Sequence, residues 1–262
     1  MTHLIVWGAG ELGGRVARRW LHTESAATGY TNTPARHAAL AAAGITPRLG
    51  SPAAELTPDV VLLLSLPGHT VQQQAVQQLV ESRAPVPRRV VFISVTGYYG
   101  SAPGPIREET PPGEGSRPAS IAQAEQTFWR WAGSAGVILR LGGLYCDGRG
   151  PYSALARRGK AGRSAPPNKT MALIHYDDAA AAVVAALKHP APEPVYLAVT
   201  PPCPTRHEFY RAACHKLGLP EPDFDPPLGL PPAEFDVARL RRDLLPSPAF
   251  PDWRMSLVFS RP

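Results

Sequence analysis

The sequence predicts an α/β fold: a Rossmann-type, doubly wound parallel sheet with a smaller C-terminal substrate-binding part. Three observations predict this fold. Over the first 140 residues, short apolar runs alternate with helical patterns, which is the order of βαβ units. Several of these runs are apolar throughout, as in strands that are buried on both faces. A glycine-rich segment separates the first apolar run from the first helical pattern.

The elements of the first half follow in a regular order. The first helical pattern places Val16, Ala17 and Trp20 on one side, so we expect this side to face the sheet. A second, alanine-rich helix ends at Gly44. Residues 101–118 are rich in Pro, Gly, Glu and Arg and are expected to form a loop over the strand ends. The expected strands are 4–7, 26–31, 59–66, 89–95 and 137–141, and the expected helices are 14–21, 34–43, 71–82 and 120–133.

After residue 145 the pattern is less regular. Thr205 is followed by Glu208 three residues later, the pattern of a capping box, so a helix is expected to begin there. We expect residues 1–145 to form the core and residues 146–262 to form a second part that is interwoven with it. The expected helices here are 177–187, 205–217 and 237–245, the expected strands are 196–199 and 255–259, and 220–232 is a proline-rich linker.

The charged residues are unevenly distributed. The 262-residue chain carries 27 Lys+Arg and a formal charge of +6, yet its lysines are only Lys160, Lys169, Lys188 and Lys216. The first 159 residues therefore contain no phosphate-binding or catalytic lysine, which excludes a P-loop there. The arginines come singly or in pairs rather than in one block, which disfavours nucleic acid as the partner.

Cysteine usage and hydropathy restrict the cellular setting. Cys146, Cys203 and Cys214 lack C-x-x-C spacing, so neither a disulfide framework nor a metal cluster is predicted. We therefore expect a reducing, cytoplasmic location. No secretory signal is visible at the N-terminus, and the longest apolar runs are too short to span a bilayer, so no membrane association is expected.

The glycine-rich segment has the pattern G-x-G-x-x-G, formed by Gly8, Gly10 and Gly13 with Glu11 and Leu12 between them. It follows a predicted strand and opens a helix, which is the context of a dinucleotide-binding loop. In such a loop the first glycine allows the tight turn. The second lets the backbone approach a pyrophosphate, and the third lets the helix pack on the strand. We therefore expect residues 1–145 to be an NAD(P)-binding core.

The end of the second predicted strand favours NADP over NAD. NAD sites usually carry an Asp or Glu roughly 20 residues beyond the glycines, to bind the ribose. Here the stretch contains Asn32 and Thr33 and no carboxylate, and Arg36 follows. Asn32 and Thr33 tolerate a 2′-phosphate, and Arg36 can pair with it. The alternative for Arg36 is an ordinary solvated helix residue, and NAD stays open as the cofactor.

Four stretches carry a family resemblance. They are the glycine segment 8–13, Ser-Val-Thr-Gly-Tyr-Tyr-Gly at 94–100, Leu-Arg-Leu-Gly-Gly-Leu-Tyr at 139–145 and Ile-His-Tyr-Asp-Asp-Ala-Ala at 174–180. Over about residues 3–220 the chain resembles the extended short-chain dehydrogenase/reductase superfamily, and within it the atypical members of the NAD(P)-dependent epimerase/dehydratase group. The resemblance implies a small-molecule substrate and a homodimer. It also implies further cofactor contacts at Leu66, Pro67, Ser94, Val95 and Leu144.

The chain departs from this family at the catalytic positions. The family uses a Tyr-x-x-x-Lys pair, in which tyrosine is the general acid/base, together with a Ser or Thr. With Ala124-Glu125 as the register mark, Arg117 stands at the tyrosine position and Ile121 at the lysine position. Val95 stands at the hydroxyl position, and a shift of one residue would place Thr96 there. No shift restores a lysine, because this part of the chain contains none.

The candidate catalytic residues are therefore Thr96, Tyr98 and Arg117. Tyr98 is a poor base at its ordinary pKa near ~10, and a nearby Arg117 would lower that pKa and bind an anionic substrate. The alternative is that Tyr98 packs and Arg117 is solvated. His175 is expected to be a structural hydrogen-bonding residue. The sequence thus predicts an NADP-dependent oxidoreductase or epimerase-like enzyme, with a non-catalytic NADP sensor as the alternative.

Overall fold

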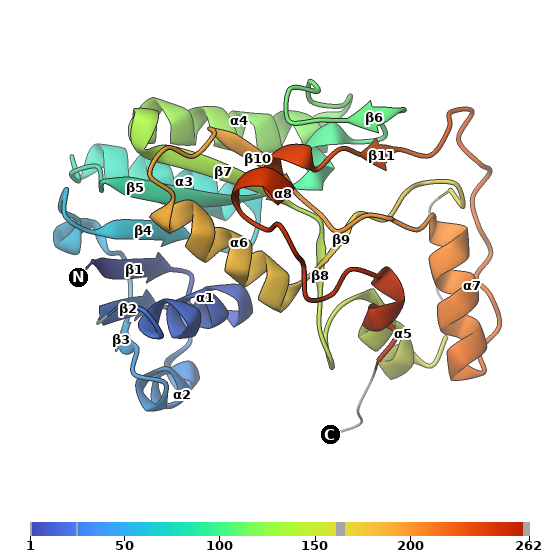
Figure 1. Cartoon of the computed structure of the whole chain (residues 1–262), viewed down its shortest axis with the longest axis horizontal. Coiled ribbons are helices and arrows are strands. Elements are labelled where there is room, and N and C mark those ends of the chain that lie inside the picture. The colour runs from blue at the N-terminus through green and yellow to red at the C-terminus, as the bar shows by residue number, and fades with distance from the viewer. Residues whose placement is uncertain (1, 25, 161–165, 259–262) are drawn as a thin grey trace.

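The computed structural model describes residues 2–24, 26–160 and 166–258, and in this part of the chain the central sheet has seven strands, all paired in parallel. Their order is β10-β7-β5-β4-β1-β2-β3 (Figure 1), so the predicted doubly wound sheet is confirmed. The strands are β1 (His3–Trp7), β2 (Ala26–Tyr30), β3 (Thr46–Arg48), β4 (Val61–Leu64), β5 (Arg89–Val95), β7 (Gly136–Leu141) and β10 (Val195–Ala198).

Helices cover both faces of this sheet, as predicted for a Rossmann-type fold. The α-helices are α1 (Glu11–Leu21), α2 (His37–Ala42), α3 (His69–Glu81), α4 (Ser116–Ala132), α5 (Pro151–Arg158), α6 (Tyr176–Lys188), α7 (Arg206–Leu217) and α8 (Ala238–Asp243). Shorter 3₁₀ helices span Pro34–Arg36, Ala53–Glu55, Thr96–Tyr99, Gly133–Ala135 and Trp253–Ser256. Two small ribbons complete the structure: β6 (Pro105–Ile106) with β11 (Glu234–Phe235), and β8 (Gly143–Tyr145) with β9 (Leu173–His175).

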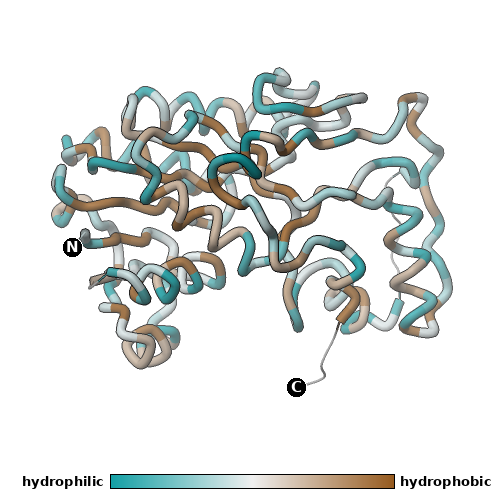
Figure 2. The backbone as a smooth tube through the Cα atoms, viewed as in Figure 1, coloured by the Kyte–Doolittle hydropathy of each residue, from teal (hydrophilic) through white to brown (hydrophobic). Residues whose placement is uncertain are grey.

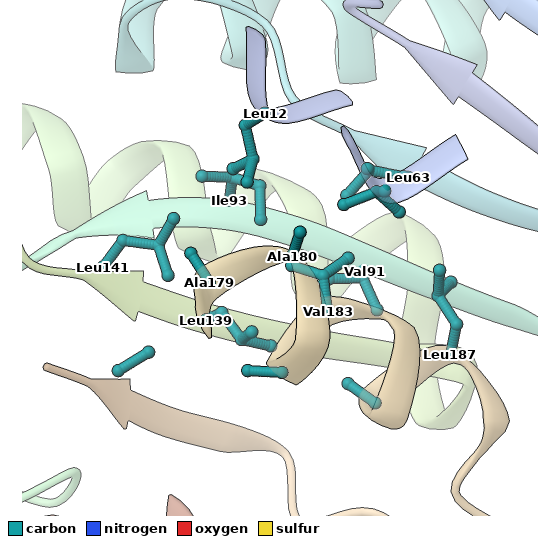
Figure 3. Packing of buried hydrophobic residues seen from close by; sticks show 14 of the residues in the cluster. Leu12, Leu63, Val91, Ile93, Leu139, Leu141, Ala179, Ala180, Val183 and Leu187 are labelled. Atoms are coloured by element: carbon teal, nitrogen blue, oxygen red, sulfur yellow. The ribbon is translucent and has the colours of Figure 1, made fainter. Parts of the chain in front are cut away.

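The alternation of side chains along the strands divides the core in two. Val91 and Ile93 of β5 face one side with α1 and α6, whereas Val90 and Phe92 face the other side with α3 and α4. Successive strand residues point to opposite faces, so a strand covered on both sides must be apolar throughout. Figure 2 shows the resulting hydrophobic strands, and Figure 3 shows α6 packed against β5 and β7.

In the described part of the chain, the sequence patterns missed six strands and α-helices, and one prediction is wrong. The missed elements are β3, β6, β8, β9, β11 and α5, which are short or contain proline. The strand expected at 255–259 is instead the 3₁₀ helix Trp253–Ser256, because the Asp252 carboxylate accepts from Arg254 N and starts a turn. Phe259 lies outside the described residues. Helix α4 begins at Ser116, earlier than expected, while the capping box at Thr205 and Glu208 is confirmed.

Some elements after β7 pack on the central sheet, and others lie away from it. Helix α6 packs on the sheet, and β10 extends it by pairing with β7. Helices α5 and α7 lie at the other end of the molecule (Figure 1), where Tyr152, Phe209 and Trp253 belong to a third apolar cluster. A division of the chain at residue 145 stays a prediction.

A buried ion pair joins the elements around the end of β5. The Arg140 guanidinium on β7 donates to Glu125 on α4, with Nη2 2.7 Å from Oε2, and both side chains are about 5% exposed. Arg140 Nη1 also donates to the Tyr99 hydroxyl and to the Glu108 carbonyl, each at 2.9 Å. Ser94 on β5 donates to Glu125 at 2.5 Å. Burial alone would lower the pKa of Arg140, but the hydrogen bonds and charge of Glu125 raise it above its ordinary value.

Breaking one side of this pair should be costly. Glu125→Gln leaves the Arg140 charge buried without a counter-charge, so we expect a loss of about 3–5 kcal/mol in the free energy of unfolding. Arg140→Met alone should cost a similar amount. The double variant should recover part of the loss, because no unpaired buried charge remains. Urea denaturation of the wild type, the two single variants and the double variant measures the coupling energy between Arg140 and Glu125. Strictly additive losses in the free energy of unfolding would contradict a buried ion pair between them.

Candidate functional site

A cavity of about 510 Å³ opens where the strand order reverses, at the carboxyl ends of β1, β2 and β4. Chain connections on the two sides of β1 run in opposite directions, which leaves a crevice at this point in doubly wound sheets. The cavity is lined by Trp7, Gly8, Gly10, Glu11, Leu12, Tyr30, Thr31, Asn32, Thr33, Arg36, Gly50, Ser65, Leu66, Pro67, Val71, Ile93, Leu144, Arg149 and Tyr176.

The three glycines of the loop have three different surroundings. Gly8 has φ +102°, and a methyl group there would collide with the Ser65 carbonyl at the end of β4. A methyl group at Gly13 would collide with the Gly8 carbonyl and lie 2.8 Å from Val6 Cγ1. At Gly10 the nearest protein atom would be 4.0 Å away, so the space beside it is open. Gly8 and Gly13 thus close the turn, and Gly10 faces the cavity.

The backbone of the loop leaves donors at the start of α1. Gly8 N and Ala9 N donate to the Tyr30 carbonyl at 3.0 and 2.9 Å, which ties the loop to β2. Gly10 is the N-cap residue of α1 and offers no side-chain cap. The first amides of a helix have no intrahelical acceptor, and they carry the positive end of the helix dipole. The start of α1 therefore offers an anion the donors of Glu11, Leu12 and Gly13.

Asn32, Thr33 and Arg36 line the other end of the cavity, beyond β2. Thr33 N donates to Thr31 Oγ1 at 3.2 Å, which shapes the turn before the 3₁₀ helix Pro34–Arg36. Among the residues that line the cavity, the one carboxylate is Glu11, and it belongs to the glycine loop. The end next to Arg36 is therefore polar and carries a positive charge.

A cluster of charges spans the mouth between the glycine loop and the segment after β8. Glu11 accepts from Arg15 Nε at 2.9 Å and pairs with Arg149 Nε at 3.3 Å. Arg15 Nη1 is 2.5 Å from Asp177 Oδ1 at the start of α6. Two carboxylates thus balance two guanidinium groups. Arg15 also donates to Cys146 Sγ at 3.6 Å, yet burial raises the pKa of that thiol, so no thiolate is indicated.

The structure brings together ten of the predicted cofactor residues but not all of them. Gly8, Gly10, Glu11, Leu12, Asn32, Thr33, Arg36, Leu66, Pro67 and Leu144 line the cavity. The other three do not line the cavity. Gly13 packs beneath the glycine loop, and Ser94 is buried and donates a hydrogen bond to Glu125. Val95 is also not among the residues that line the cavity. Sequence reasoning missed Arg149 and Tyr176. Tyr176 lies within the Ile-His motif and could have been found there, whereas Arg149 had no local signal.

The three candidate catalytic residues lie outside this lining set, at the end of β5. Thr96 and Tyr98 belong to the 3₁₀ helix Thr96–Tyr99. The cation next to Tyr98 is Arg140, whose guanidinium carbon stands 3.5 Å from the ring centroid. Arg117 is exposed in the first turn of α4, with Nε 3.4 Å from the position of a methyl group built on Gly97. Ile121, at the position that the resemblance assigns to lysine, is 1% exposed.

His175 and Asp178 have structural roles beside the cavity. His175 Nδ1 accepts from Asp177 N at 3.1 Å and caps α6, while its ring stacks on Phe250 at 3.4 Å. The Asp178 carboxylate accepts from Ala249 N and Phe250 N at 2.8 and 3.0 Å. The segment near the C-terminus therefore holds the start of α6, from which Tyr176 lines the cavity.

A larger cavity, about 1090 Å³, lies between α7 and the 3₁₀ helix Trp253–Ser256. None of the predicted site residues line it. Over the described ranges, no group of three or more His, Cys, Asp or Glu side chains could hold a metal ion. In the same ranges, no helix combines the length and the apolar character that crossing a bilayer requires.

Comparison with known proteins places the fold. No family model matches the chain. Protein YeeZ of Escherichia coli K12 is 34% identical over 164 residues, which are 60% of this chain and 57% of that protein. The aligned part is thus little more than half of the relative's length.

Solved structures match over nearly the whole chain. A functionally unknown conserved protein from Silicibacter pomeroyi has a TM-score of 0.77 at 22% identity, with 98% of this chain and 97% of that one covered. The UDP-glucuronic acid 4-epimerase of Bacillus cereus, solved with NAD, has a TM-score of 0.78 at 17% identity, covering 98% and 96%. The UDP-glucose 4-epimerase of Thermotoga maritima, solved with UDP-glucose, has 0.74 at 15%, covering 98% and 96%. The fold that the family resemblance implies is therefore confirmed.

The unequal surroundings of the glycines predict unequal effects of adding a methyl group. Gly13→Ala should lower the free energy of unfolding by about 1–3 kcal/mol, because the methyl group overpacks the contact between α1 and β1. Gly10→Ala should change it by less than about 0.5 kcal/mol, since the space is open. Denaturant titration of both variants tests this, and equal losses would contradict the different roles of the two glycines.

The His175 cap predicts a pH-dependent term in stability. Burial lowers the pKa of His175 below its ordinary value, while the nearby Asp177 and Asp178 raise it by less. As pH falls below about 6.5, the unfolded chain takes up a proton at this position that the native protein does not, so the free energy of unfolding decreases. His175→Asn keeps a capping acceptor but does not titrate.

The readout is the change in unfolding free energy between pH 7 and pH 5, measured by urea denaturation of wild type and His175→Asn. The wild type should lose more stability than the variant over this interval. Loss of the stacking on Phe250 lowers the free energy of unfolding of the variant at every pH. It therefore does not affect the change in that free energy between pH 7 and pH 5. Equal changes in the two proteins would show that His175 adds no pH-dependent term.

Proposed function

We propose that this chain is an NAD(P)-binding member of the extended short-chain dehydrogenase/reductase superfamily, that it prefers NADP, and that it acts as an oxidoreductase or epimerase-like enzyme on a small molecule. The observation that carries the proposal is the glycine loop. It is closed by Gly8 and Gly13, open beside Gly10, and set at the start of α1 where the sheet reverses. The fold and the NAD bound by the Bacillus cereus epimerase support the same reading.

The phosphate end of the cavity has the donors that a pyrophosphate needs. The first amides of α1 face an open space beside Gly10, and the helix dipole favours an anion there. The Glu11 carboxylate at this end would repel a pyrophosphate. Arg15 and Arg149 both pair with Glu11, however, so their positive charges offset this repulsion. Arg149 is half-exposed, so it is also free to turn toward a phosphate.

The adenosine end supports NADP. Asn32 and Thr33 leave this end without a carboxylate, and Arg36 lines it. A carboxylate here would repel a 2′-phosphate, whereas a guanidinium group can form two parallel hydrogen bonds with it. We therefore propose that Asn32, Thr33 and Arg36 hold the 2′-phosphate.

When bound, the nicotinamide supplies hydride transfer. On the protein side, we propose that Thr96, Tyr98 and Arg117 face the substrate from the end of β5. Thr96 would orient a substrate carbonyl by hydrogen bonding, and Arg117 would bind an anionic group. Tyr98 rests on the Arg140 guanidinium, so its place is fixed independently of substrate. A cytoplasmic location and a homodimer complete the proposal.

One observation favours a second candidate, a non-catalytic NADP sensor. Ile121 is buried at the position that the resemblance assigns to the catalytic lysine, while Arg117 and Val95 stand at the tyrosine and hydroxyl positions. A sensor would bind the dinucleotide without turning over any substrate. A panel of carbonyl compounds and nucleotide sugars separates the two candidates. Turnover that is lost in Tyr98→Phe with binding kept supports the enzyme, and no turnover over the panel supports the sensor.

Cofactor choice is tested by fluorescence titration with NADPH and NADH. We expect tighter binding of NADPH. Arg36→Ala should raise the Kd for NADPH about tenfold or more and the Kd for NADH less than about threefold, because a charge-assisted contact to the 2′-phosphate is lost. Arg19→Ala, an exposed arginine on α1 outside the cavity lining, is the control for charge.

Gly10→Ala adds an independent test of the same site. It should fold and yet bind either dinucleotide weakly, because its methyl group occupies the space beside the helix start. Absence of binding by the wild type to both cofactors would overturn the proposed function, and equal effects of Arg36→Ala on the two would overturn the preference for NADP.

A further inference from the structure

The surface beyond the end of β5 receives a lysine from the C-terminal part of the chain. Lys169 Nζ donates to Ser101 Oγ at 3.3 Å. Ser101 follows the 3₁₀ helix Thr96–Tyr99, whereas Lys169 belongs to the segment that leads to β9. The hydrogen bond therefore joins the segment that follows β5 to the segment that precedes β9. Ser101 accepts this hydrogen bond and keeps its own hydroxyl proton to donate.

The backbone holds Lys169 firmly in this place. The Lys169 carbonyl accepts from Arg206 N at 2.9 Å at the start of α7, and Lys169 N donates to the Pro166 carbonyl at 3.2 Å. The next residue, Thr170, donates from its hydroxyl to the Ala233 carbonyl at 2.8 Å. The side chain of Lys169 is therefore presented from a fixed support and not from a free loop.

Arg117 brings a second positive charge to this surface from α4. Its Nε lies beside Gly97, two residues after Val95 at the end of β5. Burial lowers the pKa of Lys169, and the positive charges of Arg206 and Arg117 lower it further, so each of these two arginines lies within electrostatic reach of Lys169. In the described part of the chain, no carboxylate is recorded within 4.0 Å of Lys169 or Arg117.

We propose that Lys169, Ser101 and Arg117 form an oxyanion-binding site for a phosphate or carboxylate group of the substrate. An ammonium, a hydroxyl and a guanidinium group supply donors without an acceptor of opposite charge, which is the composition of an anion site. Like charges held together without a counter-ion are stabilised by an anion that binds between them. The site flanks Thr96 and Tyr98. The inference rests on the proposed function, because it takes this edge of the sheet as the substrate side.

The four lysines of the chain allow a direct test. Pyridoxal 5′-phosphate carries an aldehyde and a phosphate. Its aldehyde carbon forms an imine with a neutral lysine Nζ and releases water, and cyanoborohydride then delivers a hydride to that carbon and leaves a stable secondary amine. Pyridoxal reacts in the same way without the phosphate. Peptide mapping gives the labelling rate of each lysine with each reagent. The ratio of the two rates measures the contribution of the anion.

We expect this ratio at Lys169 to exceed the ratio at Lys188 and Lys216 by about tenfold, the value of one charge-assisted contact. Lys188 pairs with Glu24, and Lys216 donates to the Leu257 carbonyl, so they are internal references. Arg117→Met should bring the ratio at Lys169 down to that of the references. Arg130→Met, at the other end of α4 and also exposed, should leave it unchanged.

The ratio separates anion recognition from the reactivity of the amine, because a changed Lys169 pKa alters both labelling rates together. Protection of Lys169 by inorganic phosphate but not succinate would assign a phosphate group to the substrate, and the reverse would assign a carboxylate. A ratio at Lys169 equal to that of the references would overturn the inference. NADPH titration of the same protein is independent of this result, so failure of this site and failure of cofactor binding are distinguishable.

Discussion

The arrangement at the carboxyl end of the sheet depends on the buried pair of Arg140 and Glu125. It joins β7 to α4, and through Ser94, Tyr99 and the Glu108 carbonyl it fixes the end of β5 and the loop that follows. Removing two charges from water is expensive, and the pair persists because hydrogen bonds satisfy the remaining donors and acceptors. The segment that carries Thr96 and Tyr98, which are proposed to face the substrate, is therefore held in place by a buried polar network at the end of an otherwise apolar sheet.

The cavity proposed to bind the dinucleotide is limited by close backbone contacts and not by polar side chains. Gly8 lies against the Ser65 carbonyl, and Gly13 lies against Gly8, so the distance between β1, β4 and α1 admits no side chain there. The same contacts direct the first amides of α1 toward the opening. At the proposed adenosine end, by contrast, specificity would depend on the exposed Asn32 and Thr33 and the half-buried Arg36, which can change without altering the fold.

Most of the sheet and the glycine loop could be predicted from sequence because both depend on local patterns. Strands buried on both faces must be apolar throughout, and β5 matched its expected bounds of 89–95. Strand β3, Thr-Pro-Arg at the sheet edge, has no such pattern. Sequence reasoning likewise placed Arg36 but not Arg149 or Lys169. Arg149 pairs with Glu11, more than a hundred residues earlier in the chain, and Lys169 contacts Ser101, 68 residues earlier. Contacts of that kind depend on tertiary structure and leave no periodicity.

The hydrogen bonds from residues 249 and 250 to Asp178 on α6 affect the order in which parts of the structure can form during synthesis. Asp178 is 2% exposed, and its carboxylate is satisfied by the amides of Ala249 and Phe250. Strands β1 to β5 can pair as they emerge, but the Asp178 carboxylate lacks these two backbone donors until residue 250 has left the ribosome. The cavity that begins at the glycine loop is therefore completed only when residues 249 and 250 are in place, since Tyr176 lines it from α6.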